Sequence, residues 1–457
     1  MNTYRRTIRL ALPAVAESLL NSMVLLVDAL MVARSGDAAL AAVGISGVVL
    51  WRVRSLASVL QTGIGALAAR RWGEGDERAA SRVLTHGMVL GLAIGTLPLL
   101  LIPFAAMIFS RLNAEGEVLA LAATYFQLII ATMPLRMAST HLSAALRACG
   151  DTRTPLYVTL GINVVNLIFN YLLIFGKFGF PALGLVGAGI ATVIAFVIEA
   201  VALAVACRRG IRPLRFAEIG NADRGLLRIT RDGFTPWLPS ITPSVLRVSL
   251  PSLGEEIAVS VGFLGFIAMI AGLGEESLAA HTSVARIESF SYMIGFGVSI
   301  GAAALVGQAL GAARADLARR AFSASLVLAA LSMAVAGFVM ILLSPLTLGL
   351  FYGFDDTRRV MIEFATPVLI IAALEQPFIG TGMVLAAGLR GAGLTMAPFL
   401  SQMAGTIVVR IGLGYLLAFE LGMGLEGVYW ATVADWVLRT IILGAIVATG
   451  RWEKTKL

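Results

Sequence analysis

The sequence predicts an all-α integral membrane protein with twelve transmembrane helices in two pseudo-symmetric six-helix lobes. Three observations support this prediction. Hydrophobic residues make up 58% of the 457 residues, twelve apolar runs are long enough to cross a bilayer, and the two halves of the chain resemble each other. A bilayer core about 30 Å thick needs roughly 20 apolar residues per helix. A soluble domain could not remove so much apolar surface from water.

The apolar runs define the expected membrane spans. They lie near 8–33, 40–69, 83–110, 118–146, 155–176, 185–207, 245–272, 279–309, 320–351, 360–389, 395–419 and 426–449. The first run contains Glu17 and Asp28 and is too long for a cleaved signal sequence, so we expect it to stay as a membrane span.

The two halves share a repeated sequence. Residues 11–82 align without a gap with residues 249–320, so that Pro13 falls on Pro251 and Glu17 on Glu255. Homologous halves made of membrane-spanning helices are typical of transporters that move one half against the other around a shared site.

Basic residues set the expected orientation. With a cytoplasmic N-terminus, 24 Lys and Arg residues lie in cytoplasmic segments and five in external loops. The positive-inside rule therefore places both termini in the cytoplasm of a multi-pass cell (inner) membrane protein. The chain divides into an N-terminal lobe (1–207), a cytoplasmic connector (208–244) and a C-terminal lobe (245–457). The net charge of +8 reflects this topology, and the chain has no basic soluble domain that would bind nucleic acid.

The sequence gives no sign of an enzyme or of a cofactor. Its two cysteines and three histidines form no disulfide framework and no zinc cluster. Its acidic pairs lack the second partner that a metal-dependent prenyltransferase would need, and no Gly-x-Ser-x-Gly elbow occurs. We expect a monomer whose partners are the lipid bilayer and a small organic substrate.

Acidic residues inside apolar spans are candidates for function, because a charge at membrane depth costs a few kcal/mol or more. They are Glu17, Asp28, Glu199, Glu255, Glu256, Glu288, Glu375 and Asp435. Asp28 is the leading candidate, since a carboxyl group among apolar side chains can exchange a proton near neutral pH. Its repeat partner is Phe266, so the second half lacks this acid. The structural alternative makes Asp28 the ion-pair partner of Arg52 or Arg54.

Three asparagines on span 155–176 are expected beside Asp28. Asn163, Asn166 and Asn170 are spaced by three and four residues and therefore share one helix face. The alternative is an amide ladder that only joins helices.

In span 8–33, Pro13 lies one turn before Glu17 and interrupts the backbone hydrogen bonding, so a helix hinge is predicted there. The alternative is an ordinary proline near a helix start, which is also common.

Several longer motifs resemble those of the multidrug and toxic compound extrusion (MATE) family. They are "LALPAVAESLL", "LVDALMVARSGDAALAAVG", "LRACGDTRTPL" and "NVVNLIFNYLLIFGKFGFPALGLVGAGIAT" in the first half, with "LGEESLAAHTSVARIESFSYMIGFGVSIGAAALVGQALGA" and "GLRGAG" in the second. The resemblance covers about residues 8–449 and, in spans 155–176 and 279–309, is closer to the DinF-like bacterial branch. It implies two six-helix lobes around a central V-shaped cavity, and export of organic compounds in exchange for protons or sodium ions.

The resemblance also implies roles for individual residues. Asp28 stands in the family's first-helix motif, where an aspartate takes part in cation coupling. Many relatives carry an aspartate in place of Asn170, which puts a two-carboxylate site in the first lobe in doubt. Glu255 and Glu375 correspond to acids that help to coordinate the coupling ion in some branches. A sodium site is allowed on this basis without assigned residues, and protons are favoured over sodium.

The predicted substrate is an organic compound, cationic or amphipathic. Aromatic, methionine and amide side chains suit such molecules through packing and cation–π contact. The candidates for lining the cavity are Asn163, Met31, Tyr157, Met269 and Tyr292, each of which could equally face lipid or the core. The alternative functions are a lipid-linked oligosaccharide flippase of the same superfamily, which the arginines at membrane depth bring into consideration, and an intramembrane enzyme, which lacks a reactive constellation.

Overall fold

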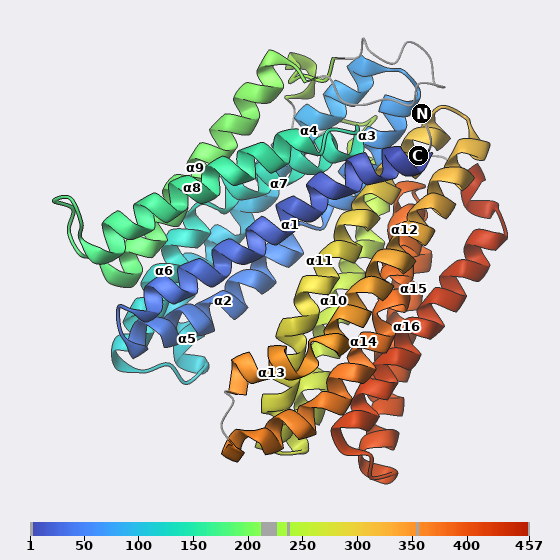
Figure 1. The fold of residues 1–457 in the computed structure, drawn as a ribbon. Helices are drawn as coiled ribbons and strands as arrows, with labels where there is room; N and C mark the ends of the chain where they lie inside the picture. Colours follow the sequence, from blue (N-terminus) through green and yellow to red (C-terminus); the bar gives the residue numbers. More distant parts are fainter. Residues whose placement is uncertain (1–2, 212–225, 235–237, 353–355, 456–457) are drawn as a thin grey trace. The chain divides into compact units, whose positions relative to one another are not determined.

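The computed structural model describes residues 3–211, 226–234, 238–352 and 356–455 (Figure 1). Within these residues the protein is helical, apart from one isolated antiparallel bridge between Ile211 and Leu227. Eleven helices among them are long and apolar enough to cross a membrane, and the pair 116–131 and 133–148, which meets at a bend of 51°, makes up to twelve. The all-helical membrane fold predicted from the sequence is therefore confirmed.

The first half contains the following elements. They are α1 (Thr3–Ala33), α2 (Asp37–Ala57), α3 (Leu60–Gly73), α4 (Glu77–Thr96), the 3-10 helix η1 (Leu97–Phe104), α5 (Ala105–Arg111), α6 (Gly116–Ala131), α7 (Met133–Ala148), α8 (Arg153–Phe175), α9 (Gly184–Arg209) and η3 (Arg231–Gly233). Pro98 and Pro103 lie in η1, where the missing backbone donors of proline interrupt α-helical hydrogen bonding.

The second half contains a corresponding series. Its elements are α10 (Thr242–Gly272), α11 (Glu275–Gly311), α12 (Ala315–Leu342), α13 (Ser344–Tyr352), α14 (Asp356–Gly391), α15 (Met396–Met403), the π-helices η4 (Ala404–Leu413) and η5 (Leu416–Glu420), α16 (Gly424–Ala448) and the 3-10 helix η6 (Arg451–Lys454). The predicted span 320–351 is broken, since α12 ends at Leu342. Pro345 follows at the start of α13, a position that proline tolerates, whereas it cannot continue a helix from the preceding turn.

The described chain forms two compact units. The N-terminal unit is Ala16–Arg247, and the C-terminal unit is Met1–Val15 together with Val248–Leu457. The boundary in α1 falls between Val15 and Ala16, just after Pro13. The predicted connector 208–244 includes residues 212–225 and 235–237, which lie outside the described residues.

The N-terminal unit is built around helices that approach closely through small residues. Helix α4 packs along α7, and a Cβ atom added to Gly91 or Gly95 would lie 2.7 or 2.5 Å from backbone atoms of α7. Aromatic and methionine side chains fill the core beside them; Phe109 and Phe126 meet edge to face, next to Met133 and Met137. Small residues at such crossings let helices approach in lipid, where no hydrophobic effect drives association.

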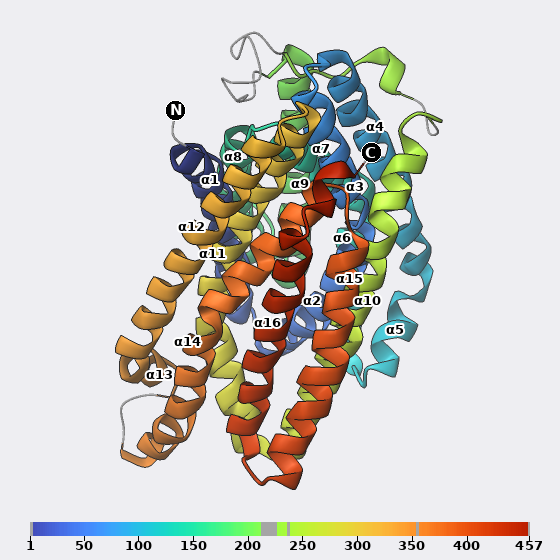
Figure 2. The same ribbon diagram turned by 90° about the vertical axis from the view of Figure 1, so that its right-hand side faces the viewer.

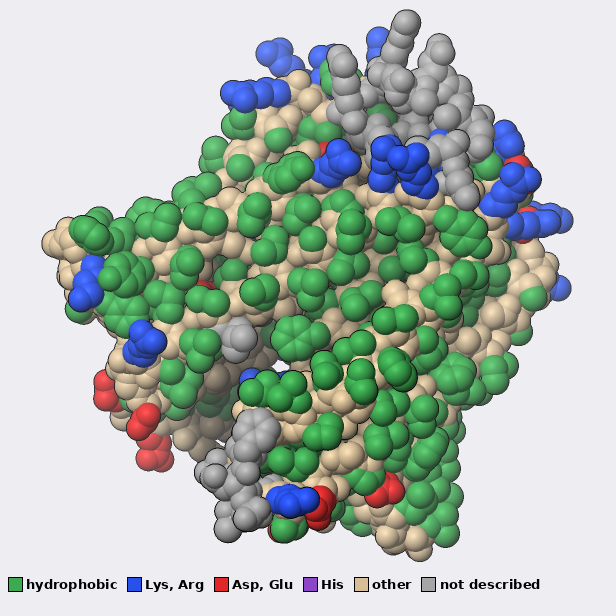
Figure 3. Space-filling model, viewed as in Figure 1, with side chains coloured by type: hydrophobic (Ala, Val, Ile, Leu, Met, Phe, Trp, Pro, Cys, Tyr) green, Lys and Arg blue, Asp and Glu red, His purple; other side chains and the backbone are tan. Residues whose placement is uncertain are grey.

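The C-terminal unit packs α11, α12, α14 and α16 side by side (Figure 2). Its core contains Phe266 and Met269 from α10 and Tyr429 from α16. Hydrophobic side chains cover most of the helix surface in Figure 3, whereas Lys and Arg gather near the ends of helices. This distribution fits a protein whose middle is surrounded by hydrocarbon.

The described part of the connector is bound to α4. Three backbone N–H groups at alternate positions donate to α4 side chains spaced by four residues: Leu226 to Glu77 (3.1 Å), Arg228 to Ser81 (3.3 Å) and Thr230 to Thr85 (2.9 Å). An extended chain advances about 6.7 Å over two residues and a helix about 6 Å over four, so the two repeats match. This segment of the connector is therefore part of the N-terminal unit.

One ion pair occurs in both halves. Arg147 of α7 donates to Glu17 of α1 at 3.0 Å, and Arg390 of α14 donates to Glu255 of α10 at 2.9 Å. Glu17 and Glu255 are repeat partners, and both arginines stand in the repeated motif that begins Leu-Arg. The pair therefore joins the same two helices in each half.

We expect Glu17→Gln and Glu255→Gln each to lower the stability of the folded protein by about 1–3 kcal/mol, because each leaves a largely buried guanidinium without its carboxylate. Neutralising both partners, as in Glu17→Gln with Arg147→Gln, should recover part of the loss. Thermal unfolding of the purified protein in detergent measures both effects.

The pair between Arg359 and Glu363 supplies the control, because both side chains are more than two-thirds exposed. Glu363→Gln should leave the unfolding temperature nearly unchanged. Equal losses for Glu363→Gln and Glu17→Gln would contradict a structural role for the repeated pair.

Candidate functional site

The N-terminal unit contains an acid and two amides in one chain of hydrogen bonds. The side-chain nitrogen Nδ2 of Asn170, on α8, donates to Oδ1 of Asp28, on α1, at 2.6 Å. The same nitrogen lies 3.1 Å from Oδ1 of Asn166, one helical turn away. Asn170 is fully buried, and Asn166 is 4% exposed. The structure therefore brings together three of the residues selected from the sequence.

The oxygen of Asn170 is the unusual atom of this group. Asn170 Oδ1 is buried, and in the described structure it has no hydrogen-bond partner. A buried acceptor without a donor is costly, so its presence beside a titratable group needs an explanation. A primary amide can donate to a carboxylate and, after rotation, accept from a carboxylic acid.

Asp28 forms none of the ion pairs found among the described residues. Arg52 lies over the ring of Trp51, with 4.6 Å between its guanidinium carbon and the ring centroid. Arg54 interacts electrostatically with Arg136 and Glu199. The two arginines proposed as structural partners of Asp28 are thus engaged elsewhere.

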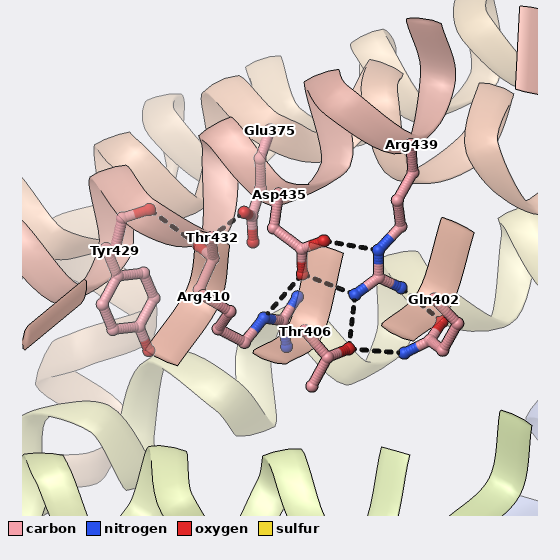
Figure 4. A network of polar contacts seen from close by, with 8 residues as sticks. All are labelled: Glu375, Gln402, Thr406, Arg410, Tyr429, Thr432, Asp435 and Arg439. Atoms are coloured by element: carbon pink, nitrogen blue, oxygen red, sulfur yellow. Dashed lines mark hydrogen bonds and ion pairs between the residues drawn. The ribbon is translucent and has the colours of Figure 1, made fainter. Parts of the chain in front are cut away.

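The C-terminal unit contains a larger polar network, drawn in Figure 4. Asp435 of α16, which is fully buried, accepts hydrogen bonds from Arg439 one turn later on the same helix and from Arg410 of η4, the latter at 2.9 Å. Arg439 also donates to Thr406, at 2.9 Å, and to Gln402. One carboxylate is therefore shared by two guanidinium groups.

Two glutamates lie next to this network. The carboxyl groups of Glu288 (α11) and Glu375 (α14) are in hydrogen-bonding contact with each other, and both interact electrostatically with Arg410. The hydroxyl of Thr432 donates to Glu375 at 2.7 Å, and Gln376 Nε2 donates to Glu288 at 3.3 Å. Like charges in contact repel each other strongly, so the two carboxyl groups are expected to share a proton.

The remaining residues selected from the sequence are dispersed. Asn163 donates to the backbone oxygen of Leu20 at 3.3 Å. Met31 packs against the core of the N-terminal unit, and Met269 is 8% exposed in the core of the C-terminal unit. Tyr157 and Tyr292 are exposed, by 65% and 38%.

The sequence did not single out the polar residues that hold the acids in place. Single polar residues in apolar helices carry no pattern, and the contacts of these four join segments far apart in the chain: Gln376 with Glu288, Thr432 with Glu375, and Thr406 and Gln402 with Arg439. Only the spacing of four between Asp435 and Arg439 was a signal of pairing on one helix face.

The comparisons with known proteins agree with this architecture. The family model described as MatE matches residues 13–172 and 251–416. A probable multidrug resistance protein NorM of Thermotoga maritima is 28% identical over 451 residues, covering 98% of this chain and 93% of the relative. Another from Burkholderia pseudomallei is 30% identical, covering 94% and 89%.

Solved structures show the same fold. The outward-facing conformation of a multidrug resistance MATE family transporter of the MOP superfamily superposes with a TM-score of 0.87 at 22% identity, covering 100% of this chain and 98% of that one. A MOP superfamily transporter from Pyrococcus furiosus gives a TM-score of 0.86 at the same identity and coverage. Both halves of the chain match the family model, and the chain therefore belongs to the MatE family of membrane transporters rather than to a class of enzymes.

Proposed function

We propose that this protein exports organic, cationic or amphipathic compounds by antiport with protons. The observation that carries the proposal is the contact between Asp28 and Asn170, which places a titratable acid of the first helix against a buried amide of α8. Relatives named as probable multidrug resistance proteins support the class of substrate. In an alternating-access transporter, proton uptake at such a site changes the stability of one state against the other.

The proposed proton step depends on the primary amide of Asn170, which has a donor nitrogen and an acceptor oxygen. With Asp28 ionised, Asn170 Nδ2 donates to the carboxylate, and the amide oxygen lacks a donor. With Asp28 protonated, a rotated amide can accept from the new O–H, which satisfies the oxygen. The hydrogen bond between Asn170 Nδ2 and Asn166, within α8, is lost in that rotation. The hydrogen bond that joins α1 to α8 changes direction, since Asn170 donates it in one state and Asp28 in the other.

We favour protons over sodium at this site. Sodium requires several oxygen ligands, as hard cations do, and Asp28 faces an amide nitrogen. The described residues contain no group of three His, Cys, Asp or Glu side chains placed to hold a metal ion. The proposed coupling group consists of Asp28, Asn166 and Asn170 in the N-terminal unit, with Glu375 as a further titratable acid in the C-terminal unit.

Glu255 remains a candidate for coupling through its ion pair. Its carboxylate accepts two hydrogen bonds from Arg390, at 2.9 and 3.1 Å, so protonation would release the arginine.

Pro13 remains the proposed hinge of α1, supported by its position just before the boundary between the two units. Structures of a MATE protein in bent and straight conformations fit the idea of a bending element in this fold.

For the substrate we propose contacts with exposed aromatic and polar side chains. Tyr157 and Tyr292 are the most accessible of the predicted residues, whereas Met31, Met269 and Asn163 are held in packed surroundings.

The proposal that this protein belongs to the DinF-like branch rests on the sequences of α8 and α11. A monomer in the cell (inner) membrane, with both termini in the cytoplasm, is the proposed state, supported by the distribution of basic residues.

A second candidate function is the flipping of lipid-linked oligosaccharides. The observation that favours it is the group formed by Arg54, Arg136 and Glu199, in which Arg136 pairs with Glu199 and Arg54 interacts electrostatically with both. The excess positive charge would suit the phosphate of a lipid carrier. Transport of a lipid-linked sugar by reconstituted protein, unaffected by a proton gradient, would favour this function.

Asp28→Asn is expected to abolish substrate efflux driven by a proton gradient, because an amide at this position cannot bind and release a proton. Expression and unfolding temperature should stay close to wild type, since an amide keeps the size of the side chain and its contact with Asn170. Efflux from proteoliposomes, with proton and sodium gradients imposed separately, measures the effect.

Glu117→Gln is the matched control, since Glu117 is an exposed acid in the first turn of α6. It should transport at the wild-type rate. Full gradient-driven efflux by a well-folded Asp28→Asn protein would show that Asp28 is not the coupling acid.

Single cysteines test the orientation. After replacement of Cys149 and Cys207 by serine, Lys177→Cys in the loop after α8 should react in intact cells with a reagent that cannot cross membranes. Lys454→Cys near the C-terminus should react only after the cells are permeabilised. The opposite pattern would invert the proposed topology.

A further inference from the structure

A second stretch of the internal repeat aligns α8 with η4 and the residues that follow. Residues 162–175 (INVVNLIFNYLLIF) and 406–419 (TIVVRIGLGYLLAF) share Val-Val, Tyr-Leu-Leu and a final Phe at identical spacing. The alignment places Arg410 where the first half has Asn166. Phe266 already stands where the first half has Asp28.

The same two positions are in contact in the C-terminal unit. The guanidinium carbon of Arg410 lies 5.6 Å from the ring centroid of Phe266, within the range of a cation–π interaction. In the N-terminal unit the corresponding helices are joined by Asp28, Asn170 and Asn166. An acid and an amide in one half are thus replaced by an aromatic ring and a permanent cation in the other.

Arg410 is the second guanidinium group on Asp435, which it contacts at 2.9 Å. Arg439 and Asp435 are paired on one helix face, and Arg439 is held further by Thr406 and Gln402. That pair is neutral by itself. With Arg410 the group carries one net positive charge, and the other acids with which Arg410 interacts electrostatically are Glu375 and Glu288.

Among the described residues, Arg410 is the cation that interacts electrostatically with both glutamates. Arg410 from η4, Tyr292 from α11 and Tyr429 from α16 face them. Tyrosine is neutral near pH 7, and Arg439 with Asp435 forms a neutral pair. Arg410 therefore supplies the net positive charge beside the carboxyl groups of Glu288 and Glu375. A metal ion approaching the glutamates would meet this fixed charge in surroundings that screen it poorly.

We propose that Arg410 is a tethered counter-cation that keeps sodium away from the carboxyl pair of Glu288 and Glu375, so that this half of the transporter exchanges only protons. This inference rests on the proposed proton coupling and makes Arg410 a residue that determines ion specificity. An arginine suits the role because its charge is permanent, whereas a lysine can be neutralised.

The test is sodium binding to the purified full-length protein in detergent, measured with radioactive sodium at constant ionic strength against choline. Wild type should show no sodium binding that depends on Glu375. Arg410→Asn, which installs the residue found in the first half, should bind sodium, and Glu375→Gln in the Arg410→Asn background should abolish that binding. Arg286→Gln removes an exposed arginine of α11 and should behave as wild type.

Arg410→Lys provides a second variant that can fold with the charge in place. It should bind no sodium near neutral pH and should gain sodium binding at alkaline pH, where lysine loses its proton, whereas wild type should not. Absence of sodium binding in folded Arg410→Asn, or in Arg410→Lys at alkaline pH, would overturn the proposal. So would sodium binding by wild type that Glu375→Gln removes.

Sodium binding by wild type that is lost in Asp28→Asn and kept in Glu375→Gln would have a different meaning. It would contradict proton coupling at Asp28 and leave the role of Arg410 intact. The two proposals therefore fail by different results.

Discussion

The cost of an uncompensated charge in hydrocarbon controls how this protein uses its polar residues. A charged side chain at the middle of a membrane helix costs a few kcal/mol or more, so it persists only with a partner. Glu17, Glu199, Glu255 and Asp435 each have an arginine. Asp28 instead has the amide of Asn170, and Glu375 has the carboxyl group of Glu288 and the hydroxyl of Thr432. Acids without an ion pair are the ones that a single proton can change most.

The internal repeat distinguishes contacts that hold the helices together from residues that differ between the halves and affect ion binding. The pair of Glu17 with Arg147 recurs as Glu255 with Arg390, joining the first helix of each half to the helix that carries the Leu-Arg motif. A contact kept in both halves is explained by a requirement that both share, which is the assembly of the helices. The positions of Asp28 and Asn166 are occupied by Phe266 and Arg410 in the other half. Ion chemistry is therefore unequal between two halves of similar build.

Sequence patterns predicted those features that depend on one helix at a time. The apolar runs gave the spans, and the gapless repeat gave the division into corresponding halves, because length and hydrophobicity are properties of a single segment. The spacing of Asn166 and Asn170 placed them on one face of α8, and the structure brings that face to Asp28. The sequence did not indicate the break after Leu342, where the apolar run continues through α13 although the helix does not.

Apart from the contact of Asp28 with the asparagines of α8, the sequence did not predict which side chains meet between helices. Arg52 and Arg54 were considered for Asp28 on proximity along the chain, but the structure places one over Trp51 and the other beside Arg136 and Glu199. Glu375 was selected as an acid, while its partner Thr432 lies on α16. Which side chains meet depends on how helices cross, and in lipid small residues such as Gly91 and Gly95 decide those crossings. The polar network thus depends on packing by residues that carry no charge. Its contacts can be identified only when the positions of the helices are known.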